Sequence, residues 1–234
     1  MFKRHLFRLF VAAVSVALGS ASLHAQTDVA ANLYATINKS TNGTSSYIVP
    51  GSYSPTFGVS QTTRNSVGVM LEVRHFFAPL IGVEATYSFH PANQKYGFAP
   101  TPQKYSGAVS PASFASVSAR AQQFTVDWIP SMKIGKLRPF GVAGVGALWV
   151  SPSSSQVPVS NIFTPGNTSS STSSVYVYGA GLDIATLPHL GLRLQYRGDI
   201  YKAPDLLVTT TQVDGNTNSW THTAEPMIGV YFRL

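Results

Sequence analysis

Apolar and polar residues alternate with a period of two in several segments of the chain. Residues 67–74 read Val-Gly-Val-Met-Leu-Glu-Val-Arg, with apolar odd positions and both charges at even positions. The same pattern recurs at 81–89, 190–197 and 228–234, and more weakly at 29–38, 121–129 and 174–184. Side chains alternate across a strand with this period, so each segment predicts a two-faced β-strand. The Gly/Ala/Val-rich residues 139–150 predict an eighth strand whose facing the pattern leaves open.

The connections between these strands alternate strictly in length. Long stretches dense in Ser, Thr, Asn, Gly and Pro occur at 39–65, 90–118, 151–173 and 201–219, and short ones at 78–79, 130–138 and 186–189. Transmembrane barrels have this arrangement, with long extracellular loops and short periplasmic turns. A secreted β-sandwich, the alternative for such strands, has no reason to sort its loops by length. The predicted fold is all-β, an eight-stranded antiparallel up-and-down transmembrane β-barrel.

The N-terminus has the organisation of a secretory signal peptide. A basic start containing Lys3, Arg4 and Arg8 precedes an apolar run from Leu9 to Leu18, and small residues follow up to Ala25. That run is shorter than the roughly 20 residues that span a bilayer as a helix. We therefore expect a signal peptide at 1–25, cleaved near Ala25, and a barrel domain at 26–234.

Composition supports export and weakens a nucleic-acid role. The formal charge of +7 falls to +4 once the signal peptide is removed, since 13 Lys and Arg then stand against 9 Asp and Glu. The high isoelectric point is thus partly a property of the signal peptide, and no nucleic-acid partner is predicted. The chain has no cysteine, which excludes disulfides and thiolate chemistry. Charged residues make up only 11% of it, well below the share in soluble domains.

Alternation assigns one strand face to lipid and the other to the lumen. The predicted lipid-facing residues are Val67, Val69, Leu71, Ile81, Val83, Leu192, Leu194, Val230 and Phe232. Aromatic residues near strand ends predict the interfacial girdles: Phe76, Phe77, Tyr87, Phe89, Trp128, Tyr178 and Tyr196. The lumen face carries five acids and four bases: Glu72, Arg74, Glu84, Asp127, Asp183, Arg193, Arg197, Glu225 and Arg233. An eight-stranded barrel is only wide enough to be filled by side chains, so these charges predict a near-neutral salt-bridge core, with a narrow ion path as the alternative.

Other candidate sites are weaker. Gly179-Ala180-Gly181 resembles part of a dinucleotide-binding turn, but alternation continues through Ile184 and no helix follows. With Gly179, Gly181 and Asp183 pointing inward, the glycines leave room for bulky neighbours and Asp183 becomes a partner for Arg193. His222 and Glu225 fall on opposite strand faces, which separates the nearest base–acid pair. No cofactor, metal site or catalytic residue is predicted.

These features together resemble the OmpA/OmpX-like eight-stranded outer-membrane barrel domain of Gram-negative bacteria. The best local matches are 82–89, 178–183, 192–197 and the C-terminal strand. Gly229, Phe232 and Leu234 resemble the C-terminal signal read by the barrel-assembly machinery, although Leu replaces the commoner final Phe. The resemblance implies an outer-membrane location, and the end of the chain at Leu234 predicts that no peptidoglycan-binding domain is attached.

The functional expectation is a non-enzymatic barrel with a filled polar lumen and four long surface loops, acting as a structural or surface-interaction protein. Its expected partners are outer-membrane lipid and lipopolysaccharide, the barrel-assembly machinery during insertion, and an extracellular ligand bound by the loops. Two membrane alternatives stay open: a narrow channel for small or apolar solutes, and a lipid A-modifying enzyme. This fold hosts many functions, so the resemblance does not choose among them.

Overall fold

The described part of the chain is built from antiparallel strands. The computed structural model describes residues 26–46, 56–78, 80–100, 113–156, 168–207, 217 and 219–234, so the predicted signal peptide lies outside it. No helix in these ranges is long and apolar enough to cross a membrane. The strands are β1 (Gln26–Asn38), β2 (Thr41–Ser46), β3 (Thr56–Thr63), β4 (Ser66–Ala78), β5 (Ile81–Pro91), β6 (Gln94–Pro100), β7 (Ser113–Trp128), β8 (Leu137–Gln156), β9 (Ser171–Ala185), β10 (Leu190–Lys202) and β11 (Trp220–Arg233).

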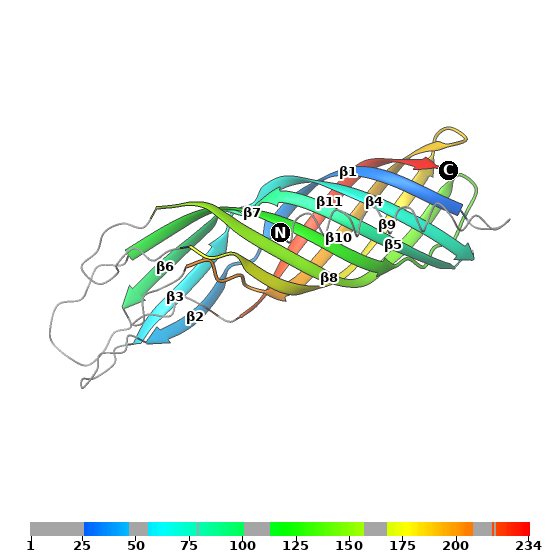
Figure 1. Ribbon diagram of the computed structural model, residues 1–234. Coiled ribbons are helices and arrows are strands. Elements are labelled where there is room, and N and C mark those ends of the chain that lie inside the picture. The colour runs from blue at the N-terminus through cyan, green and yellow to red at the C-terminus, as the bar shows by residue number, and fades with distance from the viewer. Residues whose placement is uncertain are drawn as a thin grey trace, which may run out of the picture.

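Eight of these strands close into a barrel. Neighbours follow the order β7-β5-β4-β1-β11-β10-β9-β8, and β8 pairs back onto β7. Every pairing is antiparallel, including that of the first strand with the last, where Asp28 lies opposite Arg233. The predicted all-β fold and the eight predicted strands are confirmed, and Figure 1 shows the strands tilted around a common axis. Closure satisfies the backbone of every spanning strand within the protein, as a hydrocarbon environment requires.

The short connections gather at one end of the barrel. Gly135 has a φ of 61°, and Ile134 and Leu137 on either side of this tight turn exchange two backbone hydrogen bonds of 2.7 and 3.0 Å. The last residue of the chain lies at the same end, since the Leu234 amide donates to the Thr27 carbonyl at 2.9 Å. By the rule for outer-membrane barrels, this end is periplasmic and the opposite end extracellular.

The outer surface of the barrel is apolar, as the alternation predicts. All nine residues predicted to face lipid are between 40 and 66% exposed. The opposite positions on the same strands are buried. One predicted girdle aromatic is placed differently: Phe76 is 5% exposed and lies inside the barrel under the Arg138 guanidinium, 4.5 Å from its ring centre. It faces inward because it continues the even-numbered, lumen-facing positions of Glu72 and Arg74 on β4.

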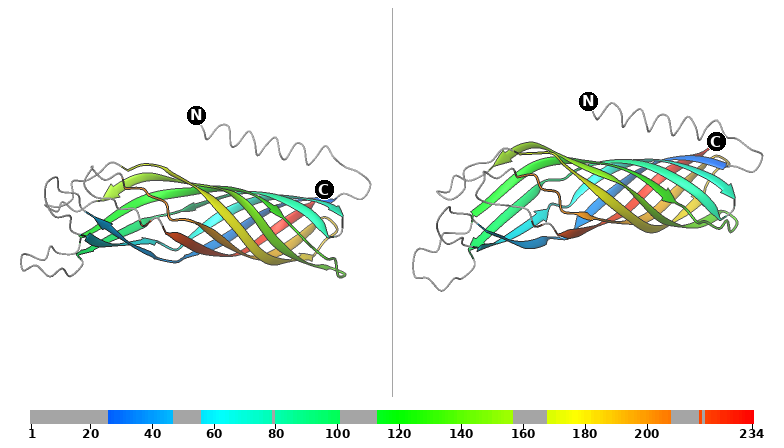
Figure 2. Two further views of the ribbon diagram at one scale, coloured as in Figure 1. Left: turned by 90° about the horizontal axis from the view of Figure 1, so that it is seen from below. Right: turned by 60° about the horizontal axis from the view of Figure 1, so that its bottom comes forward.

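Two of the predicted loops contain regular strands. β2, β3 and β6 continue the sheet beyond the barrel in the order β2-β3-β6-β7, and β6 pairs with the first half of β7. Residues 39–65 and 90–118 are therefore largely sheet where the structure describes them. Figures 1 and 2 show this extension projecting from the extracellular end on one side of the barrel. The buried inner face of the extension includes Val59, Tyr96 and Val117, which belong to the same apolar cluster as Val150 and Val175 of the barrel.

Candidate functional site

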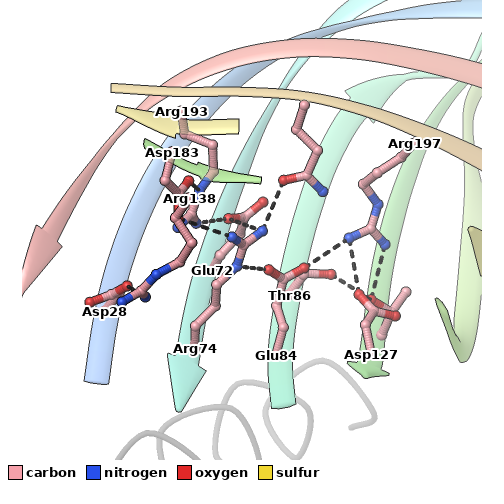
Figure 3. Close-up of polar contacts among 12 residues, drawn as sticks. Asp28, Glu72, Arg74, Glu84, Thr86, Asp127, Arg138, Asp183, Arg193 and Arg197 are labelled. Atoms are coloured by element: carbon pink, nitrogen blue, oxygen red, sulfur yellow. Dashed lines mark hydrogen bonds and ion pairs between the residues drawn. The ribbon is translucent and has the colours of Figure 1, made fainter. Parts of the chain in front are cut away.

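The centre of the lumen is organised around Arg193 on β10. Strand register places it directly opposite Asp183 of β9. The guanidinium donates from Nε to Asp183 Oδ1 at 2.7 Å and from Nη2 to Oδ2 at 3.0 Å, and its Nη1 reaches Glu72 of β4 across the barrel (Figure 3). All three side chains are 0–2% exposed. Two parallel bonds to one carboxylate are the strongest geometry available to arginine, so the Asp183–Arg193 pair that alternation suggests is the anchor of this site.

Arg74 on β4 is the second centre of the network. Its Nε bonds Glu84, which lies opposite it on β5, and its Nη2 donates to Gln195 Oε1 at 3.0 Å. Glu72 and Asp183 carboxylate oxygens lie 3.7 and 3.5 Å from its terminal nitrogens. Arg74 therefore shares both carboxylates with Arg193, and the two arginines hold four strands together through one set of ions.

Arg197 binds across the barrel and not to the residue opposite it. Its register partner is Glu225 of β11, but the Arg197 Nη1 lies 3.0 Å from Asp127 Oδ2 and 3.3 Å from Glu84 Oε1. Thr125 accepts a bond from its Nη2 at 3.1 Å. Figure 3 shows the guanidinium pointing towards β5 and β7. Glu225 therefore has no ion pair with Arg197, although the two residues lie opposite each other in strand register.

A smaller charged group closes the periplasmic end. Asp28 is 1% exposed and lies 3.5 Å from Arg138 Nη1 and 3.7 Å from Arg233 Nε. Arg138 also donates to Gln26 Oε1 at 2.8 Å. Arg233 is thus at the edge of the lumen, with 23% of its side chain exposed, and contributes less to the buried core than the other eight predicted lumen residues.

One aromatic ring fills the space between the central arginines. Arg74 stacks over the Phe140 ring at 4.0 Å, and Arg193 lies 5.7 Å from the same ring centre. A Cβ at Gly181 would lie 2.2 Å from Phe140 Cζ, so only glycine admits the ring there. The inward-facing glycine therefore makes room for Phe140, on which the arginines rest, rather than for the arginines directly.

The described lumen contains two more acids than bases once Arg138 and Arg233, which pair with Asp28, are counted beside the three fully buried arginines. Seven carboxylates are at most 2% exposed inside the barrel, against three arginines that are fully buried: Asp28, Glu72, Glu84, Asp127, Asp183, Asp199 and Glu225, against Arg74, Arg193 and Arg197. The excess lies towards the extracellular side. Asp199 accepts one bond from Gln123 at 2.7 Å, and Glu225 Oε2 has no hydrogen-bond partner within the described lumen. Both carboxylates carry a desolvation cost that an ion pair does not offset.

This imbalance predicts opposite effects for two matched substitutions. Glu225→Gln removes an unpaired buried charge and should raise the free energy of unfolding by about 1–2 kcal/mol. Glu72→Gln removes the carboxylate that Arg193 and Arg74 share and should lower it by about 2–4 kcal/mol. Urea unfolding of the barrel in phospholipid vesicles measures both. Changes of the same sign would contradict the assignment of Glu225 as the unpaired acid.

A strap of chain, residues 203–207, packs into the extracellular mouth. After β10, residues 203–207 pack inward, and Leu206 and Leu207 are 0 and 7% exposed. The strap is held by Gln61 Nε2, which donates to the Pro204 carbonyl at 2.7 Å, and by the Ser169 amide, which donates to the Leu206 carbonyl at 3.1 Å. Beneath it, the lumen is lined by apolar side chains, among them Val150, Val175 and Val177. The interior is therefore charged from the periplasmic end up to the level of Asp199, which lies opposite Val177, and apolar beyond it.

Tyr96 of β6 ties the strap to the extension. Its hydroxyl accepts a bond from the Leu206 amide at 3.3 Å and donates to Gln94 Oε1 at 2.8 Å. The ring is 0% exposed, and this burial raises the pKa of the Tyr96 hydroxyl above its ordinary value. The hydroxyl consequently stays protonated and able to donate at alkaline pH.

Comparison with known proteins places this architecture in a family. The profile of the outer membrane protein beta-barrel domain matches residues 11–232. The chain belongs to this outer-membrane barrel family. A comparison with curated protein sequences finds no match.

Solved structures of other small barrels resemble this outer-membrane barrel in fold. OprG of Pseudomonas aeruginosa shares 15% identity at a TM-score of 0.50, with 89% of this chain and 96% of that chain covered. Neisserial surface protein A shares 10% identity at a TM-score of 0.47, covering 88% and 96%. The outer membrane protease OmpT of Escherichia coli shares 8% at 0.47, covering 89% and 97%. This fold hosts many functions, so likeness in fold leaves the activity of the family member described here undecided.

His222 and Glu225, the base–acid pair considered from the sequence, do not lie together in the barrel. His222 lies on the outer surface, where its Nε2 is 2.8 Å from the Tyr178 hydroxyl and its ring stacks on the Tyr178 ring. Glu225 is inside the lumen, 1% exposed. Within the described ranges, no three His, Asp or Glu side chains gather as a metal site would require.

Sequence reasoning missed three lumen charges. Asp28 directly precedes the first predicted strand, Asp199 continues the alternation of 190–197 by two residues, and Arg138 was assigned to a turn. Extending each strand by its own alternation would have found the first two. Arg138 had no such signal, because its position depends on how the turn folds back onto Phe76.

Proposed function

We propose that this protein is a non-enzymatic outer-membrane barrel that anchors an extracellular sheet at the cell surface and acts as a structural and surface-interaction protein. One observation carries the proposal. Arg74, Arg193 and Arg197 at the centre of the lumen and the carboxylates that they bind are 0–2% exposed, which argues against a water-wide path along them in the described part of the barrel. A filled lumen supports an anchoring role better than transport, and the sheet β2-β3-β6-β7 provides a surface for partners.

The C-terminal strand supports a role in assembly for the residues identified in the sequence. Gly229 packs against Asn32, whose Oδ1 would lie 1.9 Å from a Cβ at this position. Phe232 and Leu234 are 49 and 56% exposed on the outer surface at the end of the strand. We include in the proposal that these three residues form the signal recognised by the barrel-assembly machinery, because exposed apolar side chains at a strand end are accessible to another protein.

Single-channel recording tests the closed lumen. The folded protein in a planar bilayer is expected to give no discrete conductance steps, because the arginine–carboxylate network leaves no hydrated path. An open porin recorded in the same membrane shows that steps would be resolved. Reproducible steps from this barrel would replace the proposal with the channel alternative. Unchanged lipid A mass spectra with and without the protein would separately support the absence of lipid-modifying activity.

A further inference from the structure

Acidic and basic residues are segregated between the inside and the outside of the barrel. Of the nine acids in the sequence, seven are buried in the lumen and Asp205 is half-buried. All seven exposed charged residues in the described ranges are bases: Lys39, Arg64, Lys95, Arg120, Lys133, Lys136 and Lys202. The outer surface is therefore far more cationic than the net charge suggests.

Five of these bases form a continuous arc at the extracellular edge of the barrel. The arc consists of Lys202, Lys39, Arg64, Lys95 and Arg120. These residues lie on strands at the extracellular end or on the connections beside them. Lys202 lies opposite Trp220 on β11, and Thr221 next to Trp220 donates to the Lys39 carbonyl at 3.0 Å.

The remaining contacts extend the arc towards β7. Asn38, beside Lys39, donates to the Arg64 carbonyl at 3.2 Å. The Arg64 amide donates to the Asn93 carbonyl at 2.8 Å, two residues from Lys95. Arg120 pairs with Pro91 on the adjoining strand. The arc thus runs from β10 to β7 through β11, β1, β4 and β5, and it stops at β8 and β9, whose exposed polar residues there include Ser153, Thr172 and Ser174.

Three bases of the arc lie at the depth of lipid headgroups. Lys39 follows the lipid-facing Ile37 by two residues, Lys202 follows Ile200 by two, and Arg64 precedes Val67 by three. A strand tilted by about 40° climbs roughly 2.5 Å along the membrane normal per residue, which puts these bases about 5–8 Å beyond the last apolar positions. Headgroup layers extend about the same distance beyond the hydrocarbon core. The exposed rings of Tyr176 and Trp220, 6.1 Å apart, mark the interface at this level.

We propose that this arc binds the phosphate groups of the glycolipid in the outer leaflet, along the β10-to-β7 side of the barrel. Four of its bases, Lys39, Arg64, Lys95 and Arg120, have no carboxylate within 4.0 Å among the described residues. The described carboxylates of this chain do not neutralise these bases, because seven of the eight are buried inside the barrel. Lipid is favoured over a soluble polyanion because Lys39, Arg64 and Lys202 sit at headgroup depth and directly continue the lipid-facing apolar surface.

Lipid retention by the folded full-length barrel in detergent tests the proposal. Phosphorylated lipid A and the same lipid after removal of its phosphates are added, and bound lipid is counted by native mass spectrometry. We expect phosphorylated lipid A to bind the wild type, and the variant Lys39→Gln/Arg64→Gln/Lys95→Gln/Arg120→Gln to bind it at least about tenfold more weakly, since each base near an anionic surface contributes substantially. The matched control Lys133→Gln/Lys136→Gln removes exposed charge at the periplasmic end and should bind like the wild type.

The other outcomes overturn the proposal. Equal binding of phosphorylated and dephosphorylated lipid would show that acyl chains alone are recognised, and an unaffected quadruple variant would show that the arc is not the site. Equal or tighter binding of a soluble sulfated sugar would assign the arc to a free polyanion. Heat-dependent gel mobility reports folding of each variant, and the single Arg64→Gln substitution replaces the quadruple variant if the latter does not fold. A conducting barrel would refute the closed lumen without affecting this result.

Discussion

Replacing Arg193 with methionine is expected to lower the free energy of unfolding by about 3–5 kcal/mol, the largest effect of any single lumen substitution. The side chain is fully buried and binds Asp183 through two bonds and Glu72 through a third contact. Methionine leaves both carboxylates in the protein interior with only the longer contacts of Arg74, at 3.5 and 3.7 Å. Urea unfolding in phospholipid vesicles, followed by tryptophan fluorescence, measures the loss.

A triple variant separates charge from packing. Glu72→Gln and Asp183→Asn, added to Arg193→Met, remove the two carboxylates that the single change leaves unpaired, and most of the lost stability should return. Arg193 also lies 5.3 Å from the Tyr231 ring centre, so its guanidinium packs against an aromatic ring in addition to forming ion pairs. If the triple variant is as unstable as Arg193→Met, lost packing on the aromatic rings explains the effect and the ion-pair account is wrong.

Replacing Leu206 with aspartate should release the strap from the extracellular mouth while the barrel stays folded. Leu206 is 0% exposed among apolar neighbours, and burying a charge there costs at least as much as the 2–5 kcal/mol typical of a large-to-small core change. Hydrogen exchange of residues 203–207 should then accelerate by roughly thirtyfold or more, because local opening becomes about 2 kcal/mol easier. Peptides from β4 and β10 near the charged network should exchange as in the wild type.

Leu187→Asp is the matched control for the strap. Leu187 lies in the periplasmic turn between β9 and β10 and is 61% exposed, so the same chemical change should leave both the turn and the strap unaltered. Wild-type exchange of residues 203–207 in Leu206→Asp would mean that the hydrogen bonds from Gln61 and Ser169 hold the strap without the leucine. Faster exchange throughout the barrel would mean that the mouth and the lumen unfold together.

The sequence determined the barrel and the facing of its strands, because both depend on local patterns. A period of two separates lipid-facing Val69 from lumen-facing Glu72, and this follows from strand geometry alone. Directly opposed pairs such as Asp183 and Arg193 were also accessible, since neighbouring strands joined by a short turn fix their own register. The alternating connections then oriented the barrel in the membrane.

The tertiary structure alone decided contacts between distant strands. Arg197 binds Asp127 and Glu84 across the lumen instead of Glu225 beside it, which no pattern along one strand specifies. Polar, turn-rich residues 41–46, 56–63 and 94–100 form sheet because β7 extends far enough to pair with β6. The separation of buried acids from exposed bases likewise depends on closure of the barrel. Composition gives the number of acids and bases but not which of them lie inside. Local alternation determines which face of the strand a side chain occupies. Closure of the barrel determines which residues of distant strands it contacts.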